Sequence, residues 1–204
     1  MTVTRLEPLT KTKYKVFLDG QFAFVLYKGE LLRYGIQDGA ELEEETRQKI
    51  WDEVILKRAK ARAMHLLEDM DRTESGLREK LKQGFYPEEA IESAVQYVKL
   101  FHYIDDLRYA EQFIETKKSS KSRKEIYAQL CGKGVAADKI ELAFEECYRE
   151  ENEREAIQQL IRKKRISLSQ SDSAEMQKLY GYLARKGFRY EDIRQVIQNH
   201  DENA

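Results

Sequence analysis

One pattern of apolar residues occurs three times along the chain and constrains the fold more than any other feature. In each copy the apolar residues occupy relative positions 0, 4, 14, 17 and 18. The copies are Leu77, Leu81, Ile91, Ala94 and Val95; Ile126, Leu130, Ile140, Ala143 and Phe144; and Leu179, Leu183, Ile193, Val196 and Ile197. The spacing is that of amphipathic helices, so the three copies predict tandem repeats of one helical motif.

A glycine interrupts each copy, at Gly84, Gly134 and Gly187, and it comes one place earlier in the first copy than in the others. A helix commonly ends in a left-handed residue, for which glycine is the usual choice. The glycines therefore predict a tight corner between two helices in every repeat.

Another amphipathic stretch precedes each copy, so each repeat is predicted to be a three-helix domain of the helix-turn-helix type. These stretches are Ala63, Leu66, Leu67 and Met70; Leu107, Ala110, Phe113 and Ile114; and Ala156, Ile157, Leu160 and Ile161. Helix starts are marked by Thr73 and by the capping-box spacings Ser122–Glu125 and Asp172–Glu175. In the third domain a polar loop, 167–173, separates the first two helices. Since domains this small bury little core alone, we expect an elongated, curved array in which neighbouring domains pack on each other.

The N-terminal residues follow a different pattern, with apolar residues at alternate positions. Tyr14, Val16 and Leu18 precede Asp19-Gly20, and Phe22, Phe24 and Leu26 follow it. Asp-Gly between two such runs predicts a β-hairpin. Because a lone hairpin is only marginally stable, a third strand from Val3–Leu9 or Leu31–Ile36, or a packed helix, should complete it. We expect helices from about Glu41 onward, and a division into a β module (1–45) and three-helix domains at 46–105, 106–150 and 151–204.

Composition excludes several classes of protein. The apolar runs are far shorter than the ~20 residues that cross a bilayer, and residues 1–11 lack the apolar core of a signal peptide. Cys131 and Cys147 lie 16 positions apart without a nearby histidine pair, which indicates neither a disulfide framework nor a metal site. These features predict a cytoplasmic protein that does not contact membranes.

Residue patterns typical of catalysis are missing from the sequence. No two of the three histidines have the i, i+4 spacing of a helical metal site, and no glycine-rich phosphate loop occurs. The pair Asp105-Asp106 could bind a metal in a hydrolase, but two aspartates at a helix start also satisfy its free N–H groups. We therefore predict no catalytic residue, no metal and no cofactor. A metal-dependent hydrolase is the least favoured of the candidate functions.

Three basic clusters are the candidate contact surfaces, although the overall net charge is only −1. The first comprises Lys117, Lys118, Lys121, Arg123 and Lys124; the second Arg162, Lys163, Lys164 and Arg165; the third Arg185, Lys186 and Arg189. The first lies at a predicted helix start, where cations oppose the helix dipole, so contact with phosphates or an acidic protein is one explanation and a solvated loop the other. The second lies at a helix C-terminus, which favours cations without any partner. In the third cluster, the neighbouring Phe188 is predicted to be buried in the core, and the cations are predicted to be exposed.

Three segments carry motifs typical of one protein family. Residues 103–113, Tyr-Ile-Asp-Asp-Leu-Arg-Tyr-Ala-Glu-Gln-Phe, are similar to the central signature of the bacterial RecX regulatory proteins. Residues 72–81 resemble its first motif, except that Gly76 stands where a polar residue is commoner, and residues 183–193 resemble its C-terminal motif. The motifs occur in the family's order and cover roughly residues 60–200.

The resemblance implies a non-enzymatic, monomeric modulator of the RecA recombinase in recombinational DNA repair and the SOS response. It would bind the RecA–DNA filament and, as members of the family usually do, limit its growth, strand exchange and ATP hydrolysis, whereas some members promote recombination instead. We take the three basic clusters as the candidate contacts with the filament or with DNA. Some members also bind single- or double-stranded DNA, but a pI near 6.4 favours protein contacts here. A sequence-specific, helix-turn-helix DNA-binding regulator is the alternative from another class.

Overall fold

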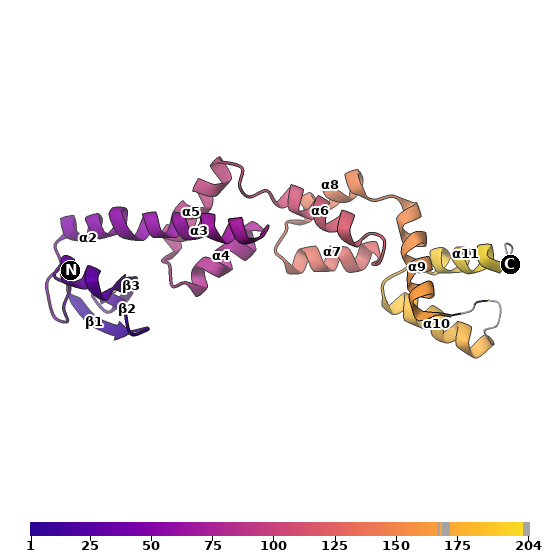
Figure 1. Cartoon of the computed structure of the whole chain (residues 1–204), viewed down its shortest axis with the longest axis horizontal. Coiled ribbons are helices and arrows are strands. Elements are labelled where there is room, and N and C mark those ends of the chain that lie inside the picture. Colours follow the sequence, from indigo (N-terminus) through magenta and orange to yellow (C-terminus); the bar gives the residue numbers. More distant parts are fainter. Residues whose placement is uncertain (167, 169–171, 202–204) are drawn as a thin grey trace. The chain divides into compact units, whose positions relative to one another are not determined.

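The computed structural model describes residues 1–166, 168 and 172–201, and Figure 1 shows its elements in chain order. The chain divides into two compact units, an N-terminal unit of Met1–Asp105 and a C-terminal unit of Asp106–Ala204. Most of the predicted polar loop at 167–173 lies outside the described residues. The finer division of the two units into a β module and three-helix domains with boundaries at 45 and 150 stays a prediction.

The N-terminal unit begins with a three-stranded antiparallel sheet in the order β1-β2-β3. The strands are β1 (Val3–Pro8), β2 (Lys13–Leu18) and β3 (Gln21–Tyr27). Asp19 and Gly20 both have positive φ angles, 46° and 84°, as the tight turn between twisted strands requires. The hairpin prediction is therefore confirmed, and β1 is the third strand.

Helical structure begins earlier than predicted, with α1 (Lys28–Arg33) rather than near Glu41. The Glu30 carboxylate accepts a hydrogen bond from the Tyr27 N–H at 2.7 Å, which caps the helix where β3 ends. Leu31 on α1 is buried in the core with Ile36. The segment Leu31–Ile36 thus packs as a helix and turn, and does not form a strand.

A continuous helix links the sheet to the first three-helix domain. It consists of α2 (Glu44–Ile50), the π-helical turn η1 (Trp51–Leu56) and α3 (Lys57–Asp69), whose junction residues keep helical backbone angles. Figure 1 shows this helix passing the sheet and then α4 (Glu74–Gln83) and α5 (Glu88–Leu100). One hydrophobic core, with Val16, Ile50 and Ile91 among its members, extends through the whole unit.

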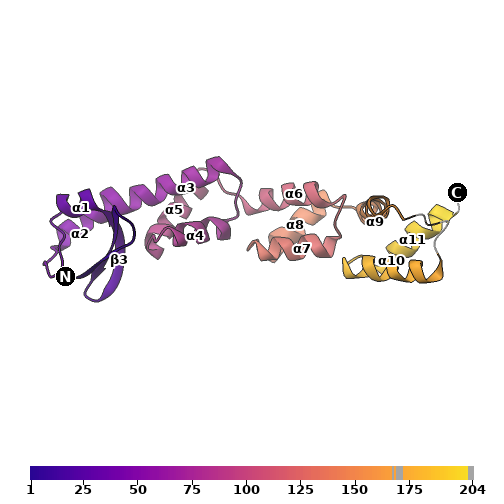
Figure 2. The same ribbon diagram turned by 60° about the horizontal axis from the view of Figure 1, so that its bottom comes forward.

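The C-terminal unit contains six helices in its described part, arranged as two three-helix domains (Figure 2). The second three-helix domain of the chain has α6 (Asp106–Lys117), α7 (Arg123–Gly132) and α8 (Ala137–Cys147), and the third has α9 (Glu150–Lys164), α10 (Ser173–Arg185) and α11 (Tyr190–Asp201). Each has its own hydrophobic core. Across both units the fifteen repeated apolar residues are at most 5 % exposed, which confirms the pattern as the core-forming element.

The predicted helix caps are present. The side chains of Thr73, Ser122 and Asp172 accept hydrogen bonds from the N–H groups of Gly76, Glu125 and Glu175 at 3.0, 3.1 and 2.7 Å. Each cap satisfies a donor that the helix itself leaves free. Met70 departs from the prediction: α3 ends one residue before it, and its side chain is 56 % exposed.

The corner of the first three-helix domain differs from the other two corners. Gly134 and Gly187 have positive φ angles of 77° and 92°, as predicted, but Gly84 has φ −80° and the left-handed residue is Phe85, with φ 59°. A Cβ at Gly84 would approach the Tyr86 ring to 3.0 Å. The glycine therefore makes room for that ring, and Phe85 takes the left-handed conformation at a cost of about 1–2 kcal/mol.

The repeat predicts which leucines carry the stability of the second domain. Leu130→Ala should lower the free energy of unfolding by about 2–5 kcal/mol, because Leu130 is fully buried and its truncation leaves a cavity. Leu142→Ala is the control, since Leu142 is 53 % exposed. Denaturant unfolding followed by circular dichroism measures both, and similar midpoints for the two variants would contradict the assignment.

Candidate functional site

The first basic cluster lies where α6 ends and α7 begins, as predicted, but much of its charge is neutralised within the protein. Lys118 Nζ lies 2.7 Å from Glu115 Oε1, and Lys121 forms an ion pair with Glu125. Arg123 pairs with Glu141 at 2.6 Å, and its guanidinium lies 4.5 Å from the centre of the Phe144 ring. These intramolecular pairs offset the unfavourable position of cations near the α7 N-terminus.

The second and third clusters lie at helix C-termini. Arg162, Lys163 and Lys164 form the last turn of α9, and Arg165 is its left-handed cap with φ 55°. Arg185 ends α10 and Lys186 caps it. All these cations and Arg189 are exposed, whereas Phe188 is 5 % exposed, so the predicted division between core and surface is confirmed.

Members of all three clusters line one groove in the C-terminal unit, which we call the basic groove. It has a volume of about 690 Å³ and is lined by Ser120, Lys121, Glu125, Gln159, Leu160, Arg162, Lys163, Lys164, Tyr182 and Lys186. Five of these ten residues are cations, against a single carboxylate, that of Glu125. The Lys164 ammonium lies 4.2 Å from the centre of the Tyr182 ring. The groove therefore offers a concentrated positive surface to an anionic partner.

The remaining predicted residues lie outside the basic groove. Lys117, Lys118, Lys124, Arg165 and Arg185 do not line it. Arg123 and Arg189 line a second cavity, of about 300 Å³, together with Arg149 and Arg154. Gln159 and Tyr182 also line the groove, but neither belongs to a motif or a charge run, so the sequence alone does not indicate them.

A junction between α7 and the α10–α11 corner brings the clusters together. Ser122 is fully buried; its hydroxyl donates to the Lys186 carbonyl at 2.7 Å and accepts from the Glu125 N–H. The predicted capping box would direct the Glu125 carboxylate to the helix start. In the structure this carboxylate instead forms an ion pair with Lys121. Ser122 thereby joins a helix start in one domain to a helix end in the next, and it holds Lys121 and Lys186 at the same groove.

A buried carboxylate forms a second link at this junction. Glu153 on α9 is 7 % exposed, and its Oε1 accepts a hydrogen bond from the Arg123 N–H at 3.0 Å. Burial raises the pKa of Glu153, and the nearby Asp192 raises it further, although the Arg123 N–H opposes the shift. Burial and the adjacent Glu153 likewise raise the pKa of the Tyr148 hydroxyl. The α7 N-terminus is thus capped from within its own domain by Ser122 and from the next domain by Glu153.

The junction predicts a strict requirement for glycine at 187. A Cβ there would lie 2.8 Å from Ser122 Oγ and 3.2 Å from Lys124 Cβ, on a residue with φ 92°. Gly187→Ala should therefore lower the free energy of unfolding by about 1–3 kcal/mol through strain and displacement of Ser122.

Gly132→Ala is the matched control, because Gly132 ends α7 with nothing within 4 Å of an added Cβ. This variant should be neutral or slightly stabilising. Urea unfolding measures both proteins, and an unchanged midpoint for Gly187→Ala would contradict the packing described.

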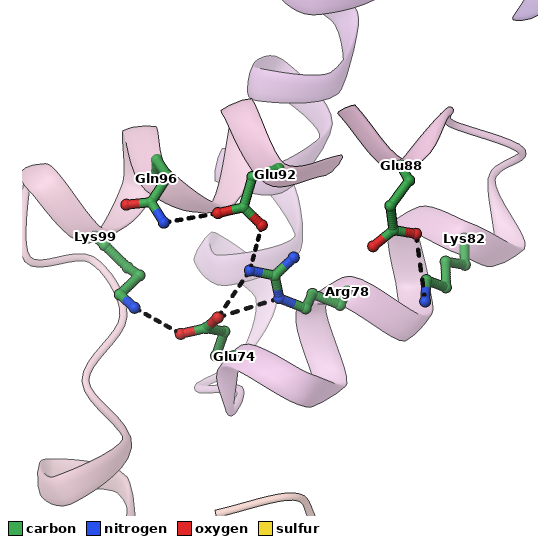
Figure 3. Close-up of polar contacts among 7 residues, drawn as sticks. All are labelled: Glu74, Arg78, Lys82, Glu88, Glu92, Gln96 and Lys99. Carbon is green, nitrogen blue, oxygen red and sulfur yellow. Dashed lines mark hydrogen bonds and ion pairs between the residues drawn. The ribbon is translucent and has the colours of Figure 1, made fainter. Parts of the chain in front are cut away.

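In the N-terminal unit, charged residues of the motif at 72–81 join α4 to α5 (Figure 3). Arg78 contacts Glu74 at 2.9 Å and Glu92 at 2.7 Å, and Lys99 contacts Glu74 at 2.8 Å. Burial tends to raise the pKa of Glu74, but hydrogen bonds from Lys99 and Arg78 lower it overall. Hydrogen bonds from Gln96 and Arg78 lower the pKa of Glu92. These motif residues therefore hold two helices together.

The network predicts a pH-dependent contribution to stability. Because the pKa of Glu74 and of Glu92 is lower in the folded protein, the contribution is complete above the ordinary glutamate pKa of 4.5 and is lost as pH falls through the lowered values. Arg78→Gln should lower the free energy of unfolding only slightly at pH 7, since Glu92 is exposed and Glu74 is only partly buried, so that solvent screens these ion pairs.

The difference between Arg78→Gln and the wild type should shrink as the pH falls below 4.5 and passes through the lowered pKa values of Glu74 and Glu92. Thermal unfolding at a series of pH values checks this expectation. A difference that stays constant over the series would show that the carboxylates do not contribute through Arg78.

Metal clusters and membrane-spanning helices are both absent from the described part of the chain. Within residues 1–166, 168 and 172–201, no group of three or more His, Cys, Asp or Glu residues is arranged to hold a metal ion. Over the same residues, no helix combines the length and apolar character that crossing a membrane requires. Asp105 and Asp106 lie at the beginning of α6, the position that the helix-start interpretation predicted.

The fold is that of a mainly helical protein built from three-helix domains behind an N-terminal antiparallel sheet. Models of the RecX family match this chain in three segments: the first three-helix domain at residues 59–97, the second at 105–143 and the third at 151–197. The chain belongs to the RecX family. Regulatory protein RecX of Caldanaerobacter subterraneus subsp. tengcongensis is 37 % identical over 97 % of this chain and 98 % of the relative.

Further relatives agree with this assignment. Regulatory protein RecX of Clostridium beijerinckii is 29 % identical over 97 % of this chain and 94 % of its own length. A crystal structure of regulatory protein RecX aligns with a TM-score of 0.62 at 26 % identity, and covers 96 % of this chain and 98 % of that structure. A crystal structure of RecX from Lactobacillus salivarius has a similar fold, with a TM-score of 0.60 over 72 % of this chain.

Proposed function

We propose that this protein is a non-enzymatic modulator of the RecA recombinase, which binds the RecA–DNA filament and limits its growth, strand exchange and ATP hydrolysis. Membership of the RecX family supports the proposal, as does the name "Regulatory protein RecX" of its relatives. The observation that carries it is the basic groove, where Lys121, Arg162, Lys163, Lys164 and Lys186 converge.

The groove suggests how the filament is recognised. Acidic protein side chains and DNA phosphates both complement five clustered cations. Arg162 and Lys163 are exposed, and neither forms an ion pair with a described residue, so their charges are available to a partner. Binding of this kind regulates by differential affinity: a filament state that fits the groove is stabilised relative to one that does not.

The helix-turn-helix alternative is less well supported by the charges of the helices. In proteins of that type the second helix of the pair lies in the major groove, close to phosphates. The corresponding helices α5, α8 and α11 each carry three or four acidic residues and a single lysine or arginine. Such helices are repelled by DNA, which favours contact with a protein surface through other parts of the chain.

Reversal of the free charges in the groove tests the proposal. Arg162→Glu with Lys163→Glu should weaken co-sedimentation with preformed RecA filaments by about tenfold or more, because two attractions become repulsions. Filament-dependent ATP hydrolysis should then proceed as it does without the protein. Binding of the wild-type protein should weaken as salt increases.

The matched control is Lys178→Glu with Arg194→Glu, which makes the same change of charge at exposed positions of the C-terminal unit outside the groove. This variant should bind filaments as the wild type does. Full activity of the Arg162/Lys163 variant, with an unchanged circular dichroism spectrum, would refute the assignment of the groove.

A further inference from the structure

The junction between the second and third domains buries a carboxylate that lies outside the basic groove. Glu153, on α9, is 7 % exposed, and its Oε1 accepts a hydrogen bond from the Arg123 N–H at the start of α7. The two domains have separate hydrophobic cores, and at this point they are joined by the Glu153–Arg123 contact and by the hydrogen bond from Ser122 to the Lys186 carbonyl. Because each core lies within its own domain, opening of the junction does not unfold either domain.

The second oxygen of this carboxylate has no partner. Glu153 Oε2 is buried and forms no hydrogen bond with the described residues, and the same is true of the Tyr148 hydroxyl. Both side chains line the cavity of about 300 Å³ at the junction. An ionised carboxylate is costly to bury when only one of its oxygens is hydrogen-bonded, whereas the protonated carboxyl group avoids most of this cost. The geometry therefore favours uptake of a proton by Glu153.

The cavity around Glu153 has no excess of positive charge. Its charged and titratable groups come from each element that meets there: Arg123 on α7; Tyr148 and Arg149 between α8 and α9; Glu150, Glu153 and Arg154 on α9; and Arg189, Glu191 and Asp192 at or next to the start of α11. The lining thus has four arginines and four carboxylates. Arg123 also forms an ion pair with Glu141, which lies outside the cavity. The surroundings therefore do not offset the cost of burying the Glu153 charge.

The electrostatic effects at Glu153 give the same direction. Burial raises the pKa of this carboxyl most, and Asp192 raises it further; the Arg123 N–H, the Tyr148 hydroxyl and Arg189 lower the pKa without reversing the shift. When the junction is open, Glu153 is solvated and its pKa returns to the ordinary value of 4.5. Closing of the junction is therefore coupled to proton uptake, and it becomes more favourable as pH falls through the raised pKa towards 4.5.

We propose that Glu153 makes the junction between the second and third domains a proton-dependent clasp, which closes more firmly when Glu153 is protonated. The neutral carboxyl group keeps its Oε1 contact with the Arg123 N–H and gains an O–H donor, for which the unpaired Tyr148 hydroxyl is an acceptor in the same cavity. The clasp also determines how closely Lys121 of the second domain and Lys186 of the third are held at the basic groove. This inference concerns the junction itself and does not rest on the proposed function.

Amide hydrogen exchange of the full chain, followed by nuclear magnetic resonance, tests the clasp without any partner. The Arg123 amide reports on the junction, because it donates to Glu153 across it. Its protection, relative to the intrinsic exchange rate at each pH, should rise as pH falls from about 8 towards 4.5, by up to about tenfold per pH unit for one proton. The Ile140 amide, bonded to the Ala136 carbonyl inside the second domain, is the internal reference and should keep a constant protection.

Three variants assign the effect to Glu153. Glu153→Gln keeps the length of the side chain and its acceptor but cannot ionise, so its Arg123 amide should be as protected at every pH as that of the wild type at low pH. Asp192→Asn removes a neighbouring negative charge and should shift the wild-type profile to lower pH. Glu151→Gln is the matched control, an exposed carboxylate on the same helix outside the cavity, and should keep the wild-type profile.

Direct titration of the carboxyl group completes the test. In isotope-labelled protein, the carboxyl signal that is missing from Glu153→Gln should titrate above 4.5. Titration at or below 4.5, protection of the Arg123 amide that stays constant or falls with decreasing pH, or an unaltered pH profile in Glu153→Gln would each overturn the proposal. The wild-type and Asp192→Asn profiles decide the matter even if Glu153→Gln does not fold. Co-sedimentation with RecA filaments is a separate readout, so failure of the clasp does not imply failure of the proposed function.

Discussion

Burial of the repeated apolar positions is the interaction on which the rest of this structure depends. The helices of the three-helix domains are 10–15 residues long, a length at which an isolated helix is marginal in water. Their stability must therefore come from the face that each one buries, and for the second and third helices of every repeat that face is formed by the same five positions. Caps at Thr73, Ser122 and Asp172 determine where helices begin, but they contribute less than the core does.

The second domain is joined to the third by a small number of polar contacts. Ser122, Glu153 and Gly187 connect the start of α7 to α9 and to the α10–α11 corner. Because Ser122 is fully buried, its hydroxyl would be costly to leave without partners, and it has one on each side of the junction. The basic groove is a consequence of this arrangement, since Lys121 directly precedes Ser122 and Lys186 supplies the carbonyl to which Ser122 donates. The position of these two cations at the groove thus depends on neutral hydrogen bonds beneath it.

Much of the fold could be predicted from local patterns. The apolar spacing located α4, α5, α7, α8, α10 and α11, and Asp19-Gly20 located the hairpin. Two features escaped prediction because they depend on packing. Helix α1 forms where Leu31 meets the core, and the corner at Phe85 follows the Tyr86 ring, which occupies the space a side chain at 84 would need. Neither effect is visible in the sequence around those residues.

The sequence by itself determined the three-helix repeats, the N-terminal hairpin, the helix caps and the twelve candidate cations, because each depends on side chains within about one or two helical turns. Only the tertiary structure decided which of these cations lie in the same groove. Lys121 and Lys186 are 65 positions apart and share a groove, whereas Lys118 and Arg123 lie beside Lys121 in sequence and are bound by Glu115 and Glu141. The physical reason is that charges interact through space, so their pairing and exposure depend on the packing of whole domains.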